Sequence, residues 1–293
     1  MTELTKKKIL ITGASSFLGR DLTNMIRETY EIFLLIHKNS IDIDTRGINI
    51  VNGSIEEPEI WEKEIPKIDI ILHLAAITHS KDPQNYTRIN NIGTQRLINF
   101  GKSAGVYHFI FISTRAIGSC CGSYGESKKI AEEAIKKYGI NHTILRVGEV
   151  YEENFIGKEG LNSLQKLIKR SFIIPYPAKL NNNLAPIHKE DVLRIIVNTI
   201  ENPKTYNKTY TVCGPENLKL KEVLVRMCKN ENKSRLLLPI PFLFIKIPLI
   251  FLSRFFNIGT PDQLQRFVCK KDLMSPNLEK DLSIKPRRFL PFS

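Results

Sequence analysis

Residues 9–19 read ILITGASSFLG, an apolar run that leads into a turn of small residues and then into an amphipathic segment. This order predicts a buried strand, a tight turn and a helix. Small residues keep side chains away from a bound phosphate, and the helix N-terminus offers free N–H groups and the positive end of its dipole. The stretch therefore predicts a pyrophosphate site for a dinucleotide, although a glycine-rich turn alone is a weak signal.

Short β-branched runs alternate with amphipathic segments through the first half of the chain, as in repeated strand–helix units. We expect strands at 8–12, 32–37, 48–52, 70–74, 108–113 and 142–146, and helices at 17–30, 85–104 and 125–137. This alternation predicts an α/β fold of the Rossmann type, a doubly wound parallel sheet with its ligand at the carboxyl ends of the strands.

The regular alternation ends near Tyr151, which suggests a division of the chain. We expect residues 1–150 to form a dinucleotide-binding domain. Residues 151–183 and 206–293 should form a smaller, mostly C-terminal substrate-binding region, with 184–205 packing back on the first domain.

The chain has 293 residues, of which 42% are hydrophobic, and this is enough for one large α/β domain or two closely joined ones. Three lysines lead directly into the first predicted strand, so we expect no signal peptide. Five cysteines without the spacing of zinc ligands predict unreactive free thiols, no metal site and a cytoplasmic location. Cys120 and Cys121 are adjacent, which is a poor geometry for a disulfide.

The net charge of +13 favours an anionic partner. The basic residues are scattered and do not form a stripe interleaved with aromatic residues, so we expect no nucleic-acid binding. A phosphate-rich cofactor, a nucleotide-linked substrate or an anionic membrane surface would each use this charge.

Residues 236–256, LLLPIPFLFIKIPLIFLSRFF, form the most apolar stretch of the chain. Three prolines and two basic residues interrupt it, whereas a membrane-spanning helix needs about 20 mostly uninterrupted apolar residues. We expect a buried or substrate-covering segment, with a peripheral membrane contact as the alternative.

Tyr124 and Lys128 are four residues apart in a predicted helix, so their side chains share one face. An ammonium group beside a phenol favours the phenolate and lowers its pKa from about 10. The tyrosine can then exchange a proton with a substrate oxygen while a nicotinamide carries the hydride. The preceding strand ends in Ser113-Thr114, which can supply a hydroxyl to the same oxygen.

Together with the HLAA stretch at 73–76, these motifs resemble the extended short-chain dehydrogenase/reductases, the nucleotide-sugar epimerase/dehydratase family. The resemblance covers residues 9 to about 286 and is most specific in the first 150. It implies that Thr114, Tyr124 and Lys128 are catalytic. The residues expected to contact the cofactor are Gly13, Ser15, Ser16, Phe17, Leu18, Gly19, His37, Lys38, Ser54, Ile55, Leu74, Ala75, Ala76, Asn90, Tyr124, Lys128 and Val147.

The chain departs from the family pattern at three places. Ser16 replaces the middle glycine of the TGxxGxxG turn, and Glu149 stands where many members carry an asparagine that contacts substrate phosphate. Only nine residues separate Thr114 from Tyr124, where the family usually has more than twenty. The missing loop normally helps to wall the sugar site, so another segment or an open pocket is expected there.

The end of the second strand bears on cofactor choice, because an acid there selects NAD and a basic residue accepts the 2′-phosphate of NADP. The chain has His37-Lys38-Asn39 and no acid, and Ser54 stands where an aspartate often contacts adenine. NADP is therefore the preferred cofactor, with NAD left open.

Thr114 is followed by Arg115-Ala116 instead of the Asp-Glu pair of 4,6-dehydratases, which argues against dehydration. The resemblance favours NAD(P)H-dependent reduction of the 4-keto group of a nucleotide-linked 6-deoxyhexosamine, such as UDP-4-keto-6-deoxy-N-acetylglucosamine, for surface polysaccharide. The side chains of Arg226, Arg235 or Arg266 would clamp the diphosphate.

A nucleotide-sugar 4-epimerase with captive NAD and a non-catalytic NADPH-binding assembly or sensor protein are the alternatives. The family often dimerises through helices that correspond to 85–104 and 125–137, so a homodimer is implied.

Overall fold

A seven-stranded parallel sheet forms the centre of the molecule in the computed structural model, which describes residues 6–38, 41–152, 160–178, 183–244 and 261–290. Its strand order is β10-β6-β5-β4-β1-β2-β3. The strands are β1 (Lys8–Thr12), β2 (Glu31–Ile36), β3 (Asn49–Asn52), β4 (Ile70–His73), β5 (His108–Thr114), β6 (His142–Val147) and β10 (Lys208–Val212). The predicted Rossmann-type fold is confirmed.

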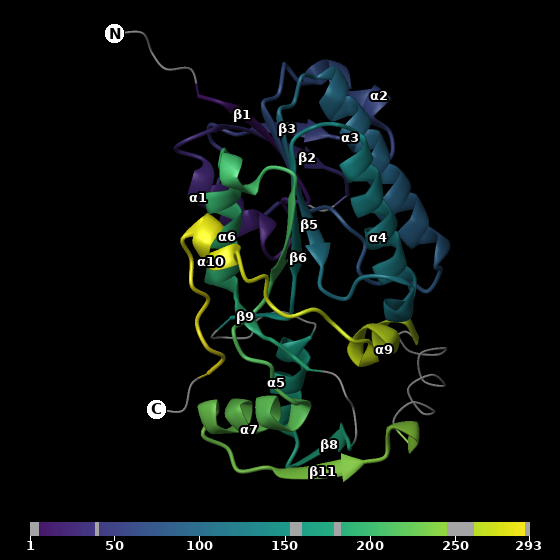
Figure 1. Ribbon diagram of the computed structural model, residues 1–293, viewed down its shortest axis with the longest axis vertical. Coiled ribbons are helices and arrows are strands. Elements are labelled where there is room, and N and C mark those ends of the chain that lie inside the picture. Colours follow the sequence, from purple (N-terminus) through teal and green to yellow (C-terminus); the bar gives the residue numbers. More distant parts are fainter. Residues whose placement is uncertain (1–5, 39–40, 153–159, 179–182, 245–260, 291–293) are drawn as a thin grey trace.

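Helices cover both faces of the sheet (Figure 1). On one face lie α1 (Gly19–Ile26), α6 (Lys189–Thr199) and the short α10 (Leu278–Leu282). On the other lie α2 (Pro58–Trp61), α3 (Thr94–Ser103) and α4 (Gly122–Lys137), with a π-helical segment, η2 (Tyr86–Gly93), running into α3. The predicted first helix starts two residues late, at Gly19, because residues 13–18 form the turn.

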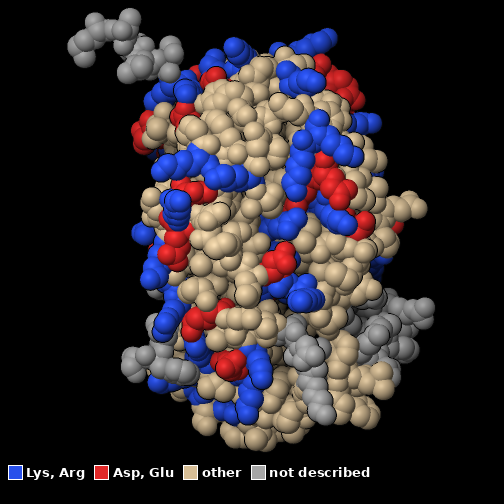
Figure 2. Space-filling model, in the orientation of Figure 1, with Lys and Arg blue, Asp and Glu red and all other residues tan. Residues whose placement is uncertain are grey.

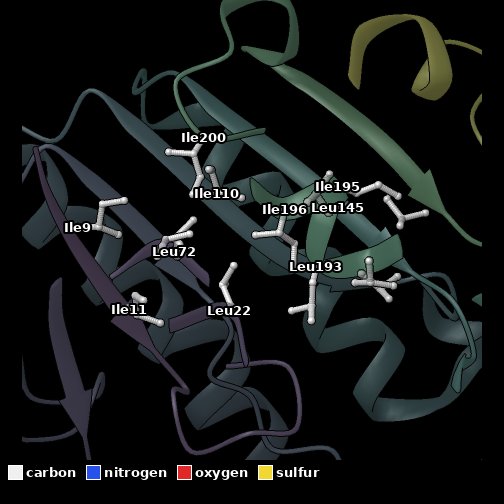
Figure 3. Close-up of a cluster of buried hydrophobic side chains, with 14 of the residues drawn as sticks. Ile9, Ile11, Leu22, Leu72, Ile110, Leu145, Leu193, Ile195, Ile196 and Ile200 are labelled. Carbon is white, nitrogen blue, oxygen red and sulfur yellow. The ribbon is translucent and has the colours of Figure 1, made fainter. Parts of the chain in front are cut away.

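The sheet separates two hydrophobic cores because successive side chains of a strand point to opposite faces. Ile9 and Ile11 of β1 join the core beneath α1 and α6, together with Leu22 and Ile195 (Figure 3). Leu10 of the same strand joins the core on the α3 and α4 side. Because β1 packs into a core on each face, the position of the loop at its carboxyl end is fixed.

A smaller region lies below the large sheet in Figure 1. It contains α5 (Leu161–Arg170), α7 (Leu220–Asn230) and a parallel pair of strands, β8 (Ile173–Pro177) and β11 (Leu236–Ile240). A second short pair, β7 (Val150–Tyr151) and β9 (Ile187–His188), connects the two regions, and α9 (Pro261–Val268) lies against α4. Strand β10, which we assigned to the substrate-binding region, is instead the edge strand of the large sheet.

The apolar stretch that starts at Leu236 is not buried where the structure describes it. Leu236, Leu238, Leu243 and Phe244 are 53%, 44%, 61% and 69% exposed, so the expectation of a buried segment is wrong for these residues, and the substrate-covering role stays a prediction. The remainder of the stretch, 245–256, lies outside the described residues. Within the described ranges, no helix is long and apolar enough to cross a membrane.

Candidate active site

The turn between β1 and α1 is closely packed against the end of β4. Gly13 has a φ of +75°, and a Cβ atom there would collide with the backbone of Leu74 and Ala75; one at Gly19 would collide with the Gly13 carbonyl. Ser16 Oγ accepts a hydrogen bond from the Gly19 N–H at 3.1 Å. Ser16 therefore closes the turn where the family has a glycine.

Leu18, the residue before α1, makes no side-chain cap, and the N–H groups of Gly19 and Arg20 bond to Ser16 of the same turn. A backbone cradle that no Cβ can enter, at the start of a helix, fits a pyrophosphate. Ser15 lies in this turn. The Phe17 ring lies 4.1 Å from the ammonium of Lys189, which is held by Asp21 and Glu152.

The other expected cofactor residues also lie at the carboxyl edge. His37 and Lys38 follow β2 and are exposed. Ser54 and Ile55 follow β3, where Ser54 Oγ accepts a hydrogen bond from the Glu56 N–H at 3.1 Å and Ile55 packs against Gly93. The edges of three adjacent strands thus carry the predicted residues for the adenosine half of a dinucleotide.

Asn90 joins the segment after β4 to the helix of the predicted catalytic tyrosine. Its side chain accepts from the Ile77 N–H at 2.8 Å and donates to the Ile77 carbonyl at 3.0 Å and Ser127 Oγ at 3.2 Å. Leu74, Ala75 and Ala76 occupy the same segment, and the Ala75 N–H donates to Thr12 Oγ1 at 3.3 Å. Asn90 therefore has a structural role that accounts for its burial.

The three predicted catalytic residues come from two elements. Thr114 ends β5, where it pairs with Val147 of β6, and Tyr124 and Lys128 lie in α4. The Thr114 side chain lies near enough to the Tyr124 phenol to lower its pKa, and Tyr124 is 8% exposed. The structure thus brings the threonine hydroxyl and the phenol together at the carboxyl edge of the sheet.

Lys128 points away from the phenol. Its ammonium donates to the Ile112 carbonyl at 2.7 Å and lies 3.9 Å from the centroid of the Phe111 ring. Burial lowers the pKa of Lys128 to about 7, despite the attraction of Glu132. The expectation that Lys128 lowers the pKa of Tyr124 is wrong for this arrangement: burial raises the pKa of Tyr124, and the groups that act against burial are Arg266 and Thr114.

Helix α9 supplies the cation that faces Tyr124. The Arg266 guanidinium carbon lies 4.5 Å from the centroid of the Tyr124 ring, and Arg266 donates to the Thr78 carbonyl at 2.8 Å. Asp262 pairs with Arg266 at 3.1 Å and accepts a hydrogen bond from the Tyr124 N–H, also at 3.1 Å. The sequence signal for this helix was the short stretch between Thr114 and Tyr124, which leaves space for another segment.

Arg266 thus contacts the tyrosine, whereas the other two arginines expected to clamp a diphosphate lie in the smaller region. Arg226 pairs with Glu216 at 2.8 Å, and Arg235 donates to the Ile168 carbonyl at 2.7 Å. Both guanidinium groups are engaged by the protein itself.

A disulfide between Cys121 and Cys269 joins the start of α4 to the residue after α9. The prediction that all five cysteines remain free thiols is therefore wrong for this pair, because the fold brings together two residues 148 positions apart. Cys120, Cys213 and Cys228 are free, and Cys120 is the exposed one of the three.

Two buried ion-pair groups fix the edge of the sheet beside Tyr124. Glu132 of α4 pairs with Arg146 of β6 at 2.7 Å and accepts from Ser113 Oγ at 2.6 Å. Glu149 lies between Arg115, at 3.0 Å, and Lys271, at 2.8 Å.

Burial opposes the ionisation of Glu149, but Lys271 and Arg115 hold its pKa below the ordinary value. The residue that replaces the family asparagine is thus an anion held by two cations of the chain. Among the described residues, no group of three or more His, Cys, Asp or Glu side chains could hold a metal ion.

A parallel Rossmann-type sheet, a glycine turn at the first strand and a hydroxyl–tyrosine pair at β5 and α4 define the chain as a dinucleotide-dependent enzyme of the oxidoreductase type. Residues 9–213 match the profile of the NAD dependent epimerase/dehydratase family, and the chain belongs to that family.

Two similar proteins indicate the range of chemistry in the family. A UDP-glucose 4-epimerase of Vibrio cholerae is 23% identical over 82% of this chain and 81% of its own length. A GDP-6-deoxy-D-talose 4-dehydrogenase of Aggregatibacter actinomycetemcomitans is 27% identical over 46% of this chain and 43% of its own.

The crystal structure of the Bordetella bronchiseptica enzyme WbmG in complex with NAD and UDP shares the fold. Its TM-score is 0.72, with 18% identity over 97% of this chain and 91% of that one. NAD and a nucleotide are therefore bound by a protein with this architecture.

Proposed function

We propose that the protein reduces the 4-keto group of a nucleotide-linked 6-deoxyhexosamine, using NADPH. The observation that carries the proposal is the buried Tyr124 next to the half-buried Thr114, at the carboxyl edge of the sheet that also carries the glycine turn. A hydroxyl and a phenol that lie close together can both direct protons to one carbonyl oxygen.

In this mechanism Tyr124 gives its proton to the ketone oxygen, and the Thr114 hydroxyl donates a hydrogen bond to the same atom. The bound nicotinamide supplies the hydride. The turn from Gly13 to Gly19 would hold the pyrophosphate, whereas Lys128, whose buried ammonium donates to the Ile112 carbonyl, supports α4 against β5. Because Tyr124 is buried with a raised pKa, it is the protonated acid that reduction requires.

We assign NADP as the preferred cofactor because the end of β2 carries His37 and Lys38, both exposed, and no acid. A 2′-phosphate would meet positive charge at Lys38, whereas a free 2′-hydroxyl would find no carboxylate there. Dehydration is disfavoured because Arg115, directly after Thr114, is committed to Glu149.

The first experiment follows oxidation of NADPH, and separately of NADH, by the purified protein with UDP-4-keto-6-deoxy-N-acetylglucosamine. We expect stoichiometric consumption of NADPH and formation of a 6-deoxy-N-acetylhexosamine nucleotide. Consumption of neither cofactor, with NAD retained by the purified protein, would favour the 4-epimerase that the Vibrio relative represents.

Tyr124→Phe separates an enzyme from a non-catalytic NADPH-binding protein. We expect turnover to fall by about 10²-fold or more while nucleotide binding persists, since general acid catalysis contributes about 10²–10⁴. Tyr138→Phe, directly after α4 at the end away from Tyr124, is the matched control and should leave turnover unchanged. Equal loss of nucleotide binding and turnover in Tyr124→Phe would contradict a catalytic role.

We also propose a homodimer through η2, α3 and α4. Ile92 of η2 and Ile130 of α4 are 42% and 36% exposed on these contacting elements. Ile130→Asp should convert a dimer to a monomer in sedimentation experiments, and an unchanged sedimentation coefficient would exclude this face.

A further inference from the structure

The outer face of the β8–β11 pair is apolar and exposed. In this parallel pair Leu236 is aligned with Ile173 and Leu238 with Pro175. Ile173, Leu236 and Leu238 are 48%, 53% and 44% exposed, although strands alternate apolar and polar residues when one face meets water. The opposite face packs on the smaller region's core through Ile174 and related side chains.

Three more large, exposed apolar side chains adjoin the two strands in the sequence. Phe172 directly precedes β8 and is 66% exposed, and Leu243 and Phe244 follow β11 with 61% and 69% exposure. We call the six residues the apolar end: Phe172, Ile173, Leu236, Leu238, Leu243 and Phe244. Strands β8 and β11 lie at the lower tip of the molecule, where Figure 2 shows a mostly uncharged surface.

Basic residues gather along one edge of the apolar end. Lys169 and Arg170 precede β8, and Lys233 and Arg235 precede β11. The strands are parallel, so these four residues meet at the same edge of the pair. Glu231 is the one acid in the same two flanks, and it pairs with Lys169 at 3.6 Å. The edge therefore carries more positive than negative charge.

We propose that the apolar end docks the protein on an anionic lipid surface. Exposed phenylalanine and leucine side chains enter the boundary between headgroups and acyl chains, and neighbouring Lys and Arg residues contact anionic headgroups. A second copy of the chain would bring the same excess of positive charge, so self-association through this face lacks charge complementarity. The docking is independent of the reaction at Tyr124.

The test is flotation of the full chain with vesicles of phosphatidylcholine alone or with added phosphatidylserine. We expect binding to the mixed vesicles, and weaker binding to phosphatidylcholine and at high salt. The double variant Leu238→Asp/Phe244→Asp should lower the partition coefficient at least tenfold. Replacing Lys233 with Gln should lower it about fivefold on anionic vesicles, since each basic residue near the surface contributes about 1 kcal/mol.

Ile60→Asp is the matched control, because Ile60 is 63% exposed in α2, at the other end of the molecule. It should bind vesicles as the unmodified chain does. Equal binding by all variants, or none by the unmodified chain, would overturn the proposal. The proposal would also be overturned if the double variant bound vesicles normally but had a different sedimentation coefficient. That result would show that the apolar end contacts a second copy of the chain. Flotation needs no substrate and does not depend on the reductase proposal.

Discussion

Replacing Lys128 with Met should change how the stability of the protein depends on pH. The Lys128 side chain is fully enclosed in α4, with its ammonium on the Ile112 carbonyl and over the Phe111 ring. Burial lowers its pKa from 10.5 to about 7. Between these two values the unfolded chain holds a proton that the folded chain has released. The free energy of unfolding therefore rises with pH in that window.

The magnitude follows from the shift. Below pH 7 the folded protein carries the full cost of a buried ammonium, and this cost disappears as the pH rises toward 10.5. One pKa unit corresponds to about 1.4 kcal/mol, so raising the pH from 7 to 9 should stabilise the unmodified chain by up to about 3 kcal/mol relative to Lys128→Met. Attraction to the Phe111 ring favours the ammonium and makes this an upper bound.

Urea denaturation of both proteins at pH 6.5, 7.5, 8.5 and 9 and fixed ionic strength measures the difference. Tyr124→Phe serves as a control and should keep the alkaline gain, because the phenol does not contact Lys128. Parallel stability curves for the unmodified chain and Lys128→Met would refute the reasoning. They would show that the ring and the carbonyl hold the ammonium charged throughout this range.

Three further substitutions test the packing around the site. Glu132→Gln should lower the free energy of unfolding by about 3 kcal/mol, because it leaves the Arg146 guanidinium without its buried anion. Urea titration measures this loss, and a loss under about 1 kcal/mol would contradict the role of the ion pair. Gly19→Ala should cost about 1–3 kcal/mol and weaken NADPH binding in fluorescence titrations, since the added methyl meets turn backbone, and unchanged affinity would exclude the turn as the phosphate cradle. Cys269→Ser should lower stability by about 2–4 kcal/mol, as should dithiothreitol treatment of the unmodified chain, and a Cys121→Ser background should show no additional loss.

The central sheet was predictable because its information is local. Each buried strand is a short apolar run next to a turn, and the order of runs and amphipathic segments fixes a parallel topology. The turn from Gly13 to Gly19 was identified for the same reason, since its small residues adjoin the strand that positions them. For the six predicted strands and their helices only boundaries shifted, as where Gly122 starts α4 three residues before the predicted helix; the seventh strand, β10, was assigned to the other region because it follows a long stretch without regular alternation.

The surroundings of Tyr124 were not predictable from spacing. A tyrosine and a lysine four apart share a helix face, but the direction of each side chain depends on what packs against that face. The Lys128 ammonium donates to the Ile112 carbonyl beneath the helix, and the Tyr124 ring contacts Arg266 of α9. The second contact joins residues that are far apart in the sequence, and a single sequence carries no signal for it.

The short connection between Thr114 and Tyr124 and the position of α9 have a common physical explanation. With nine residues in that connection, the first domain alone leaves the tyrosine without a wall, and α9 supplies one through Asp262 and Arg266. Packing α9 against α4 closes the long loop between Cys121 and Cys269, and the entropic cost of closing a loop grows with its length. The disulfide from Cys121 offsets this cost by restricting the unfolded chain. The surroundings of Tyr124 are therefore complete only when the C-terminal part of the chain has folded onto α4, and α9 is the element that couples the stability of the smaller region to the environment of the Tyr124 phenol.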